Sequence, residues 1–112
     1  MDLIWPPREL HPNARIHFMA KAKITKQYRE YTRIMARQSG IELPAEGKID
    51  VYITFLPPDK RRRDMDGCLN SVKAALDGIA DGLKVNDYRF RLHLDMGEPV
   101  KGGCVRVEFE LP

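Results

Sequence analysis

The spacing of apolar residues alternates along the chain between a two-residue and a helical period, and this alternation most constrains the fold. Over 49–55 every second side chain is apolar, which predicts a strand with one buried face, and a proline pair ends it. The same pattern returns over 90–96 and 105–111, while a short apolar run over 3–5 stops at another proline. The sequence therefore predicts four strands.

Two segments between these strands follow the helical period. From about Ala22 to Arg37, and from about Asp66 to Leu83, apolar side chains recur at steps of three and four residues. Asp66 is suited to cap the second helix, and residues 8–20 are expected to form a loop. The order β-α-β-α-β-β predicts an α+β fold in which two helices pack on a mixed four-stranded sheet. A length of 112 residues, 43% of them hydrophobic, fits a single domain over 1–112.

Composition excludes several classes of protein. No apolar run approaches the roughly 18 residues of a membrane span, and the first residues lack the pattern of a signal peptide, so we expect a soluble, cytoplasmic protein without a membrane partner. Cys68 and Cys104 have no CxxC or His-rich neighbourhood, which argues against a disulfide scaffold and a zinc site and favours two reduced thiols. The glycines lack the spacing of the common phosphate-binding loops, so no small-molecule cofactor is expected.

The formal net charge of +3 conceals a division of the chain into a basic and an acidic part. Residues 1–63 contain 13 Lys and Arg against 7 Asp and Glu, whereas residues 64–112 contain 6 against 9. Clustered cations, more than net charge, determine binding to a polyanion. The division is therefore compatible with a nucleic-acid partner.

Four cations stand directly before two acids at the boundary of these parts. If the segment is extended, Asp64 and Asp66 project to the same side, where their repulsion is relieved when a divalent cation such as Mg²⁺ bridges them. The alternative is one helix cap and one solvated acid, with the basic run, Lys60, Arg61, Arg62 and Arg63, as a solvated loop. The combination of the basic run with the two acids is what is expected where a phosphodiester is held against a metal ion.

Polar residues continue this site along the second helix. Asp66, Asn70, Lys73 and Asp77 lie within roughly 60° of one another around a helix axis. Lys73 can reach a phosphate oxygen from this row, or it can simply pair with Asp77. A third acid, Asp87, follows the helix and is either part of the site or a turn residue.

The first helix is expected to carry a basic solvent face. Its cations recur at three- and four-residue spacing: Lys26, Arg29, Arg33 and Arg37. Together with Lys60, Arg61, Arg62, Arg63 and Asn70, the first three are candidates for binding a nucleic-acid backbone.

Three motifs closely resemble the RusA family of Holliday junction resolvases: Arg61-Arg62-Arg63-Asp64-Met65-Asp66, Lys73-Ala74-Ala75-Leu76-Asp77 and Gly82-Leu83-Lys84-Val85-Asn86-Asp87. The resemblance implies a RusA-like fold and a small homodimeric endonuclease of DNA recombination and repair. Such an enzyme binds four-way DNA junctions and, with Mg²⁺ or Mn²⁺, nicks two opposing strands symmetrically. It also implies that Asp64, Asp66 and Asp87 bind the metal and that Lys73 is catalytic.

The sequence departs from the family pattern in three places. Gly67 stands where the family usually has Asn, and Asn86 stands where it has another acid. The family lysine commonly lies four residues after the second acid, a position occupied here by Asn70, so either Lys73 or Asn70 fills that place. Two other functions stay open: a non-catalytic module that binds junctions or duplexes, and a nuclease of the same chemistry acting on other branched DNA.

Overall fold

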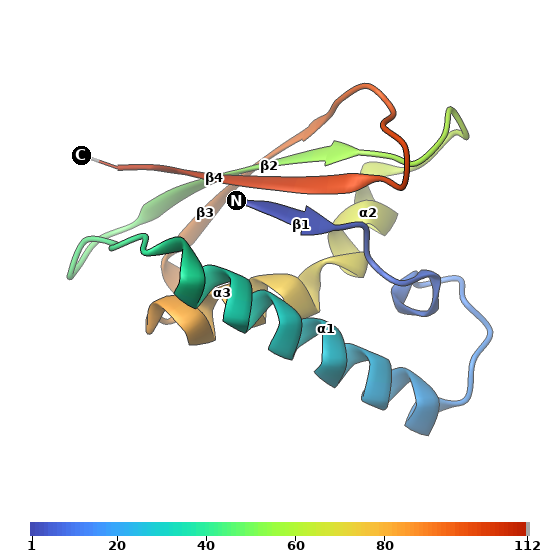
Figure 1. The fold of residues 1–112 in the computed structure, drawn as a ribbon, viewed down its shortest axis with the longest axis horizontal. Coiled ribbons are helices and arrows are strands. Elements are labelled where there is room, and N and C mark those ends of the chain that lie inside the picture. The colour runs from blue at the N-terminus through green and yellow to red at the C-terminus, as the bar shows by residue number, and fades with distance from the viewer. Residues whose placement is uncertain (112) are drawn as a thin grey trace.

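Four strands and three α-helices make up the part of the chain that the structure describes, residues 1–111 of a computed structural model (Figure 1). Two short 3-10 helices, η1 and η2, complete it. In chain order the elements are β1 (Asp2–Ile4), η1 (Arg8–Leu10), α1 (Phe18–Ser39), β2 (Ile49–Leu56), α2 (Met65–Ser71), α3 (Lys73–Leu83), η2 (Asp87–Arg89), β3 (Phe90–Met96) and β4 (Cys104–Glu110).

The strands form one mixed sheet in the order β1-β4-β2-β3. β4 runs antiparallel to both of its neighbours, whereas β2 and β3 are parallel. Parallel neighbours need a long crossover, and here α2 and α3 supply it. The predicted α+β class, the four strands and the mixed sheet are confirmed.

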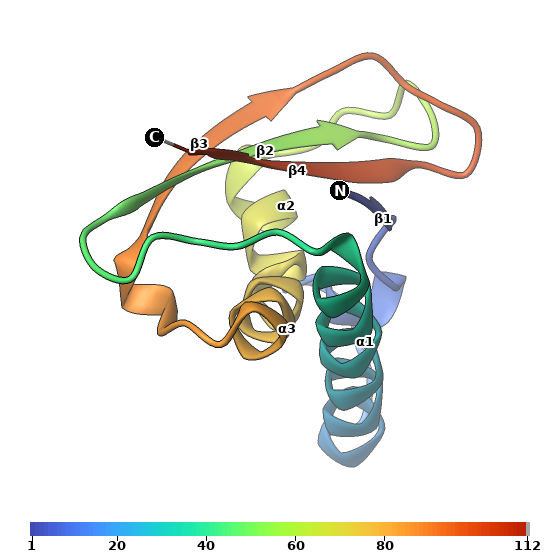
Figure 2. The same cartoon turned by 60° about the vertical axis from the view of Figure 1, so that its left-hand side comes forward.

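The three α-helices cover one face of this sheet, as Figure 2 shows. The alternating residues of β2 explain the arrangement: Val51, Ile53 and Phe55 face the helices and are fully buried. Ile79 of α3 meets them from the other side of the core. The opposite face of the sheet is left without a helix among residues 1–111. Of the helices described, none has both the length and the apolar character needed to cross a bilayer.

The predicted second helix is two helices, and its predicted cap is wrong. Val72, with φ −106° and ψ 9°, interrupts the helix, and its N–H donates to the carbonyl of Leu69, three residues back. The carbonyl of Val72 then accepts from the N–H of Leu76, and this hydrogen bond is the first of α3. Asp64 is the N-cap residue of α2, and Asp66 lies in its first turn. Apolar steps of three and four residues continue across the break, so periodicity could not reveal it.

Helix α1 begins earlier than predicted, so the expected loop over 8–20 is partly wrong. Nδ1 of His17 accepts from the N–H of Met19 at 3.2 Å and caps the first turn. Phe18 and Met19 are strongly exposed and therefore add nothing to the apolar stripe that marks the rest of the helix. The helix ends at Gly40, whose φ of 70° is left-handed, as predicted.

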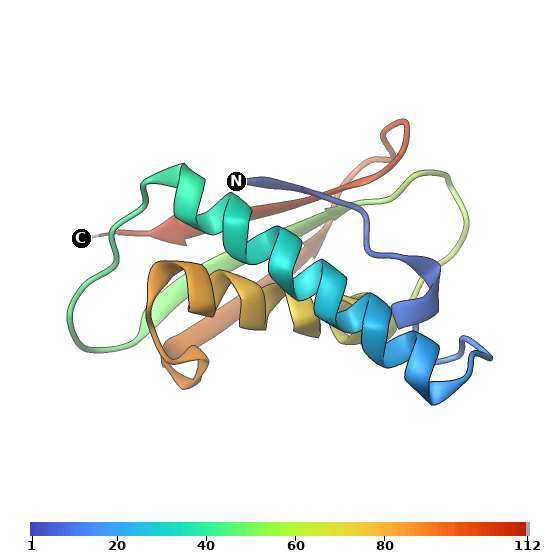
Figure 3. The ribbon, with the colours of Figure 1, turned by 60° about the horizontal axis from the view of Figure 1, so that its bottom comes forward.

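Helices α1 and α3 cross at very short range (Figure 3). A Cβ atom on Gly78 would overlap the Oγ1 of Thr32 and the backbone carbonyl of Arg29. One turn later, a Cβ atom on Gly82 would lie 2.5 Å from the carbonyl oxygen of Arg33. The two glycines therefore let the helices pack backbone to backbone.

Candidate nucleic-acid interface

A hollow of about 440 Å³ opens beside the N-terminus of α2. Its walls come from the segment after β1, from η1 and from the loop that joins β2 to α2. We call it the basic hollow, and its lining consists of Trp5, Pro6, Pro7, Arg8, His11, Asn13, Arg61, Arg62, Arg63, Asp64, Cys68 and Ser71. Four arginines against one carboxylate make it a site for an anion.

The loop that carries the basic run is held together by Asp59 and Arg63. The N–H of Arg61 donates to Oδ1 of Asp59 at 2.9 Å, and the Arg63 guanidinium pairs with the same carboxylate at 3.0 Å. Arg63 also donates to two backbone carbonyls of the loop and stacks 5.6 Å from the ring centroid of Trp5. Its side chain is only 18% exposed, so Arg63 shapes the loop from inside.

The other cations of the run are free to meet a ligand. Lys60, Arg61 and Arg62 are exposed. Within residues 1–111 Lys60 and Arg62 have no ion-pair partner, while Arg61 has only a loose contact of 3.9 Å with Asp59. A phosphate group can therefore bind these side chains without breaking a strong internal pair.

Asp64 and Asp66 are placed differently from the prediction. Only Asp64 is extended, with φ −88° and ψ 141°, whereas Asp66 is helical, so the alternation of a strand does not bring the two carboxylates to one side. Asp64 lines the basic hollow and Asp66 does not. Both are exposed, and in the described part of the chain neither carboxylate has a hydrogen-bond or ion-pair partner.

This pair suits a hard divalent cation only in part. Mg²⁺ is commonly bound by one or two carboxylates, with water and substrate phosphates completing its shell, and unpartnered Asp64 and Asp66 have that chemistry. However, no three His, Cys, Asp or Glu side chains among residues 1–111 lie close enough together to hold a metal ion. The predicted set of three acids is therefore not assembled within one chain.

The third predicted acid, Asp87, lies at the far end of α3. It lines a hollow of about 380 Å³ together with Arg29, Asp77 and Asp81. Burial raises the pKa of Asp77, and the adjoining carboxyl of Asp87 raises it further, while Arg29 opposes both. Asp87 therefore meets Asp77, the last residue of the predicted polar row, and not the acids at its start.

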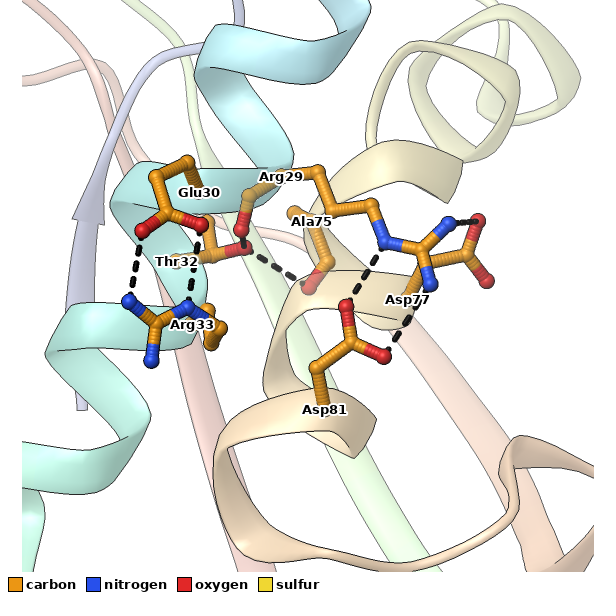
Figure 4. A network of polar contacts seen from close by, with 7 residues as sticks. All are labelled: Arg29, Glu30, Thr32, Arg33, Ala75, Asp77 and Asp81. Carbon is orange, nitrogen blue, oxygen red and sulfur yellow. Dashed lines mark hydrogen bonds and ion pairs between the residues drawn. The ribbon is translucent and has the colours of Figure 1, made fainter.

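Arg29 joins α1 to α3 (Figure 4). Its guanidinium donates to both carboxylate oxygens of Asp81, at 2.7 and 3.0 Å, and lies 3.9 Å from Asp77. The hydrogen bond from Arg29 lowers the pKa of Asp81. Nearby, the Oγ1 of buried Thr32 lies 3.1 Å from the backbone carbonyl oxygens of both Arg29 and Ala75, and its hydroxyl donates to them. This predicted DNA-binding arginine thus has a structural pairing.

The other residues predicted to bind DNA also divide into those with an ion-pair partner and those without. Arg33 pairs with Glu30 on its own helix, whereas Lys26 is exposed and has no ion-pair partner among residues 1–111. Asn70 and Lys73 are exposed on the two sides of the break at Val72. Asp77 contacts Arg29 at 3.9 Å, and no ion pair joins it to Lys73.

Sequence reasoning missed part of the hollow and the role of two glycines. Arg8 and His11 belong to the hollow but lie in a segment without periodic pattern. The signal for the helix crossing was present, since Gly78 and Gly82 are one helical turn apart, a spacing that places small residues on one face. Both cysteines are free, and burial raises the pKa of Cys68, which keeps that thiol protonated.

The open face of the sheet has the opposite charge. Five acidic side chains project from it against two arginines: Asp2, Asp50, Asp95, Glu108 and Glu110, with Arg91 and Arg106. Cross-strand pairs join several of them, including Arg91 with Asp50 at 2.6 Å. A polyanion is repelled from this face and drawn to the basic hollow.

The chain is similar to a protein of Xylella fastidiosa (strain Temecula1 / ATCC 700964) that bears the name "Uncharacterized protein". The two are 44% identical over 96 residues, which cover 83% of this chain and 63% of the relative. The chain thus spans less than two thirds of the length of that relative. No family model matches the chain.

Proposed function

We propose that this protein is a metal-dependent endonuclease that resolves four-way DNA junctions by paired nicks, in the manner of the RusA family that its motifs resemble. One observation carries the proposal: the unpartnered carboxylate of Asp64 opens into a hollow lined by four arginines. Such a hollow can hold a phosphodiester beside an acid that is free to bind a cation.

Each candidate residue has a role in this proposal. Asp64 and Asp66 would hold Mg²⁺ or Mn²⁺, which when bound would activate water and stabilise charge on the phosphate. Arg8, Arg61 and Arg62 bind the phosphates that flank the scissile bond. Lys73 follows Asp66 on the exposed side of the helix pair and neutralises charge on the reacting phosphate. Arg63 keeps the loop in shape.

A homodimer is part of the same proposal. A four-way junction has approximate two-fold symmetry, and symmetric nicks require two active sites related by the same axis. Each protomer would then supply one basic hollow to one of the two opposing strands.

The test is cleavage of a labelled four-way junction with and without Mg²⁺. Asp64→Asn and Asp66→Asn should each abolish nicking while junction affinity stays equal or rises, since removing a negative charge costs metal affinity but reduces repulsion of DNA. Glu108→Gln, which removes an acid from the open face of the sheet, is the matched control and should nick normally. Wild-type nicking by both aspartate variants would show that the metal site lies elsewhere.

A non-catalytic module that binds branched DNA is the second candidate. The observation that favours it is the lack, within residues 1–111, of three clustered metal-ligating side chains. This candidate predicts tight junction binding without nicking under Mg²⁺ and Mn²⁺ alike. Flaps, forks and junctions compared at fixed salt would then identify the preferred DNA, because charge-driven affinity alone is not specificity.

A further inference from the structure

The first turn of α1 exposes two large apolar side chains. Phe18 is 75% exposed, more than any other large apolar side chain of residues 1–111, and Met19 is 65% exposed. The first buried side chain of the helix is Tyr28, and the turns before it extend past α3 and away from the sheet (Figure 2). Neither Phe18 nor Met19 belongs to the hydrophobic core, so the fold does not require an aromatic ring at this place.

His17 holds the ring of Phe18 in position. The two rings are stacked, with their centroids 4.7 Å apart and their planes at 28°. The imidazole is itself fixed, because its Nδ1 accepts from the N–H of Met19 at 3.2 Å. One face of the Phe18 ring therefore lies on His17, and the other is open to a ligand. A ring that is already ordered loses little conformational entropy on binding, and we call this pair the His17–Phe18 platform.

The surroundings of the platform are basic. Residues 10–29 contain five Lys and Arg and no Asp or Glu. Met19, Lys23 and Lys26 follow one another at steps of four and three residues, which places them on one face of α1. Arg15 precedes the platform in the chain. Across residues 1–111 no ion pair engages Arg15, Lys23 or Lys26, so these cations are free to bind phosphate.

A second hollow leads from the basic hollow toward the platform. It has a volume of about 530 Å³ and includes Arg15 in its lining. Three residues line both hollows: Arg8, His11 and Asn13. The acid in the second hollow, Glu9, is paired with Arg8 at 3.5 Å. A nucleic-acid backbone with one phosphate beside Asp64 can therefore continue along this surface to the start of α1.

From these observations we propose that Phe18 stacks on a nucleobase of bound DNA at a position where base stacking is interrupted, and that Arg15 and Lys23 bind the neighbouring phosphates. Inside a continuous duplex both faces of a base are covered by its neighbours, whereas at a branch point one face is accessible. Aromatic rings beside cations are a common way to bind bases that have left the stack. The platform thus distinguishes branched DNA from continuous duplex. The proposal rests on the DNA binding proposed above and not on nicking, so it holds equally for a non-catalytic binder.

The same surface fits a membrane less well. A helix that lies in a bilayer interface buries a broad apolar face along its length. Over residues 18–27 of α1, the large apolar side chains that are exposed are Phe18 and Met19 alone. The turn that follows presents Ala22, Lys23 and Lys26 to solvent.

The test compares the affinities of Phe18 variants for a four-way junction and for a closed circular duplex, which has neither ends nor branches. Phe18→Ala should weaken junction binding roughly 5- to 150-fold, the usual scale for losing one base–aromatic stack. Its affinity for the circle, and the salt slope for both DNAs, should stay unchanged because no phosphate contact is lost. Phe18→Tyr, which keeps the ring, should bind like the wild type.

Tyr52→Ala is the matched control. The ring of Tyr52 also stacks on a histidine, His93, at 4.5 Å, but it lies on the acidic open face of the sheet. This variant should bind both DNAs normally. As a direct readout, 5-iodouracil at the branch point should crosslink to the peptide that contains Phe18 on irradiation, and Phe18→Ala should abolish that product.

Equal junction affinity of wild type and Phe18→Ala would overturn the proposal. So would a Phe18→Ala variant that binds DNA normally but no longer binds phosphatidylserine vesicles or a second copy of the chain, since the platform would then serve a membrane or another protein. A wild type that binds junctions through Phe18 but never nicks them would refute the nuclease and leave the platform standing. Normal nicking and binding by Phe18→Ala would refute the platform alone.

Discussion

Charged side chains on the same helix of this protein differ in what they are bonded to. Arg29 is held by Asp81 across the helix crossing, whereas Lys26, on the preceding turn, is free of ion pairs in residues 1–111. We expect Lys26→Gln to weaken DNA binding and to make the dependence of log affinity on log salt shallower by about 1. Arg29→Gln should instead lower the free energy of unfolding, by about 1 kcal/mol or less because the pair is half exposed. Salt-titrated binding and urea denaturation of both variants would check this, and equal salt slopes for the two would contradict it.

The carboxylate of Asp50 makes stability depend on pH. Hydrogen bonds from Arg91 and then His93 hold the pKa of Asp50 well below its usual range. Because the folded pKa is lower than the unfolded value of about 3.9, this stabilisation is complete at about pH 5 and above and is lost as the pH falls further. The stability difference between wild type and Asp50→Asn should therefore shrink as the pH is lowered from about 5 to about 2. Urea denaturation at one protein concentration would measure it, and a constant difference would argue against the pairing.

Single residues were the hardest level to predict from sequence. Arg61, Arg62 and Arg63 are indistinguishable by type and position, yet only the guanidinium of Arg63 both pairs closely with Asp59, at 3.0 Å, and stacks on Trp5. Its partner Trp5 is remote in sequence, so nothing in the basic run marks the difference. Asp87 was likewise placed with Asp64 by resemblance, while the chain folds it against Asp77.

The contact between α1 and α3 depends on a residue that elsewhere would weaken a helix. Gly78→Ala should lower the free energy of unfolding by about 1–3 kcal/mol, because the new Cβ atom meets backbone and a buried threonine and forces the helices apart. Ala in place of Gly in a helix normally gains about 1 kcal/mol, so the expected sign is the reverse of the ordinary one.

Gly67→Ala in α2 is the control for that prediction. Its Cβ atom would lie 3.0 Å from Nε2 of His11, the end of an exposed side chain that needs to shift by only a few tenths of an ångström. Stability should therefore be unchanged or higher. Thermal denaturation of both variants decides the matter, and a neutral Gly78→Ala would show that the two helices do not depend on this close contact.

At the level of elements the sequence was far more informative. The sequence places the four strands within one or two residues, because each is an alternating or short apolar run with a proline or glycine near one end. The break at Val72 and the early start of α1 were missed for opposite reasons: apolar spacing runs on through the first, and exposed Phe18 and Met19 hide the second.

The whole molecule separates its charges between two surfaces, so the proposed DNA contact is expected on the basic one. Lys60→Gln with Arg62→Gln should weaken binding to duplex and junction alike and make the salt slope shallower by about 2, since both cations are free of ion pairs within residues 1–111. Lys48→Gln is the control, because Lys48 precedes β2 at the end away from the basic run and bonds the carbonyl of Tyr88. The fluorescence anisotropy of labelled DNA, titrated at several salt concentrations, would measure the slopes. An unchanged slope in the double variant would show that the basic run is only a solvated loop.

Because of the break at Val72, α2 and α3 pack against different parts of the molecule. α3 is locked to α1 through Gly78 and Gly82, whereas α2 stands on η1 and on the side chain of His11. The two helices can therefore open as separate cooperative units, and amide exchange in α2 is free to proceed while α3 stays protected. An anion seated at the N-terminus of α2 would slow hydrogen exchange over Met65–Ser71 and leave Lys73–Leu83 unchanged.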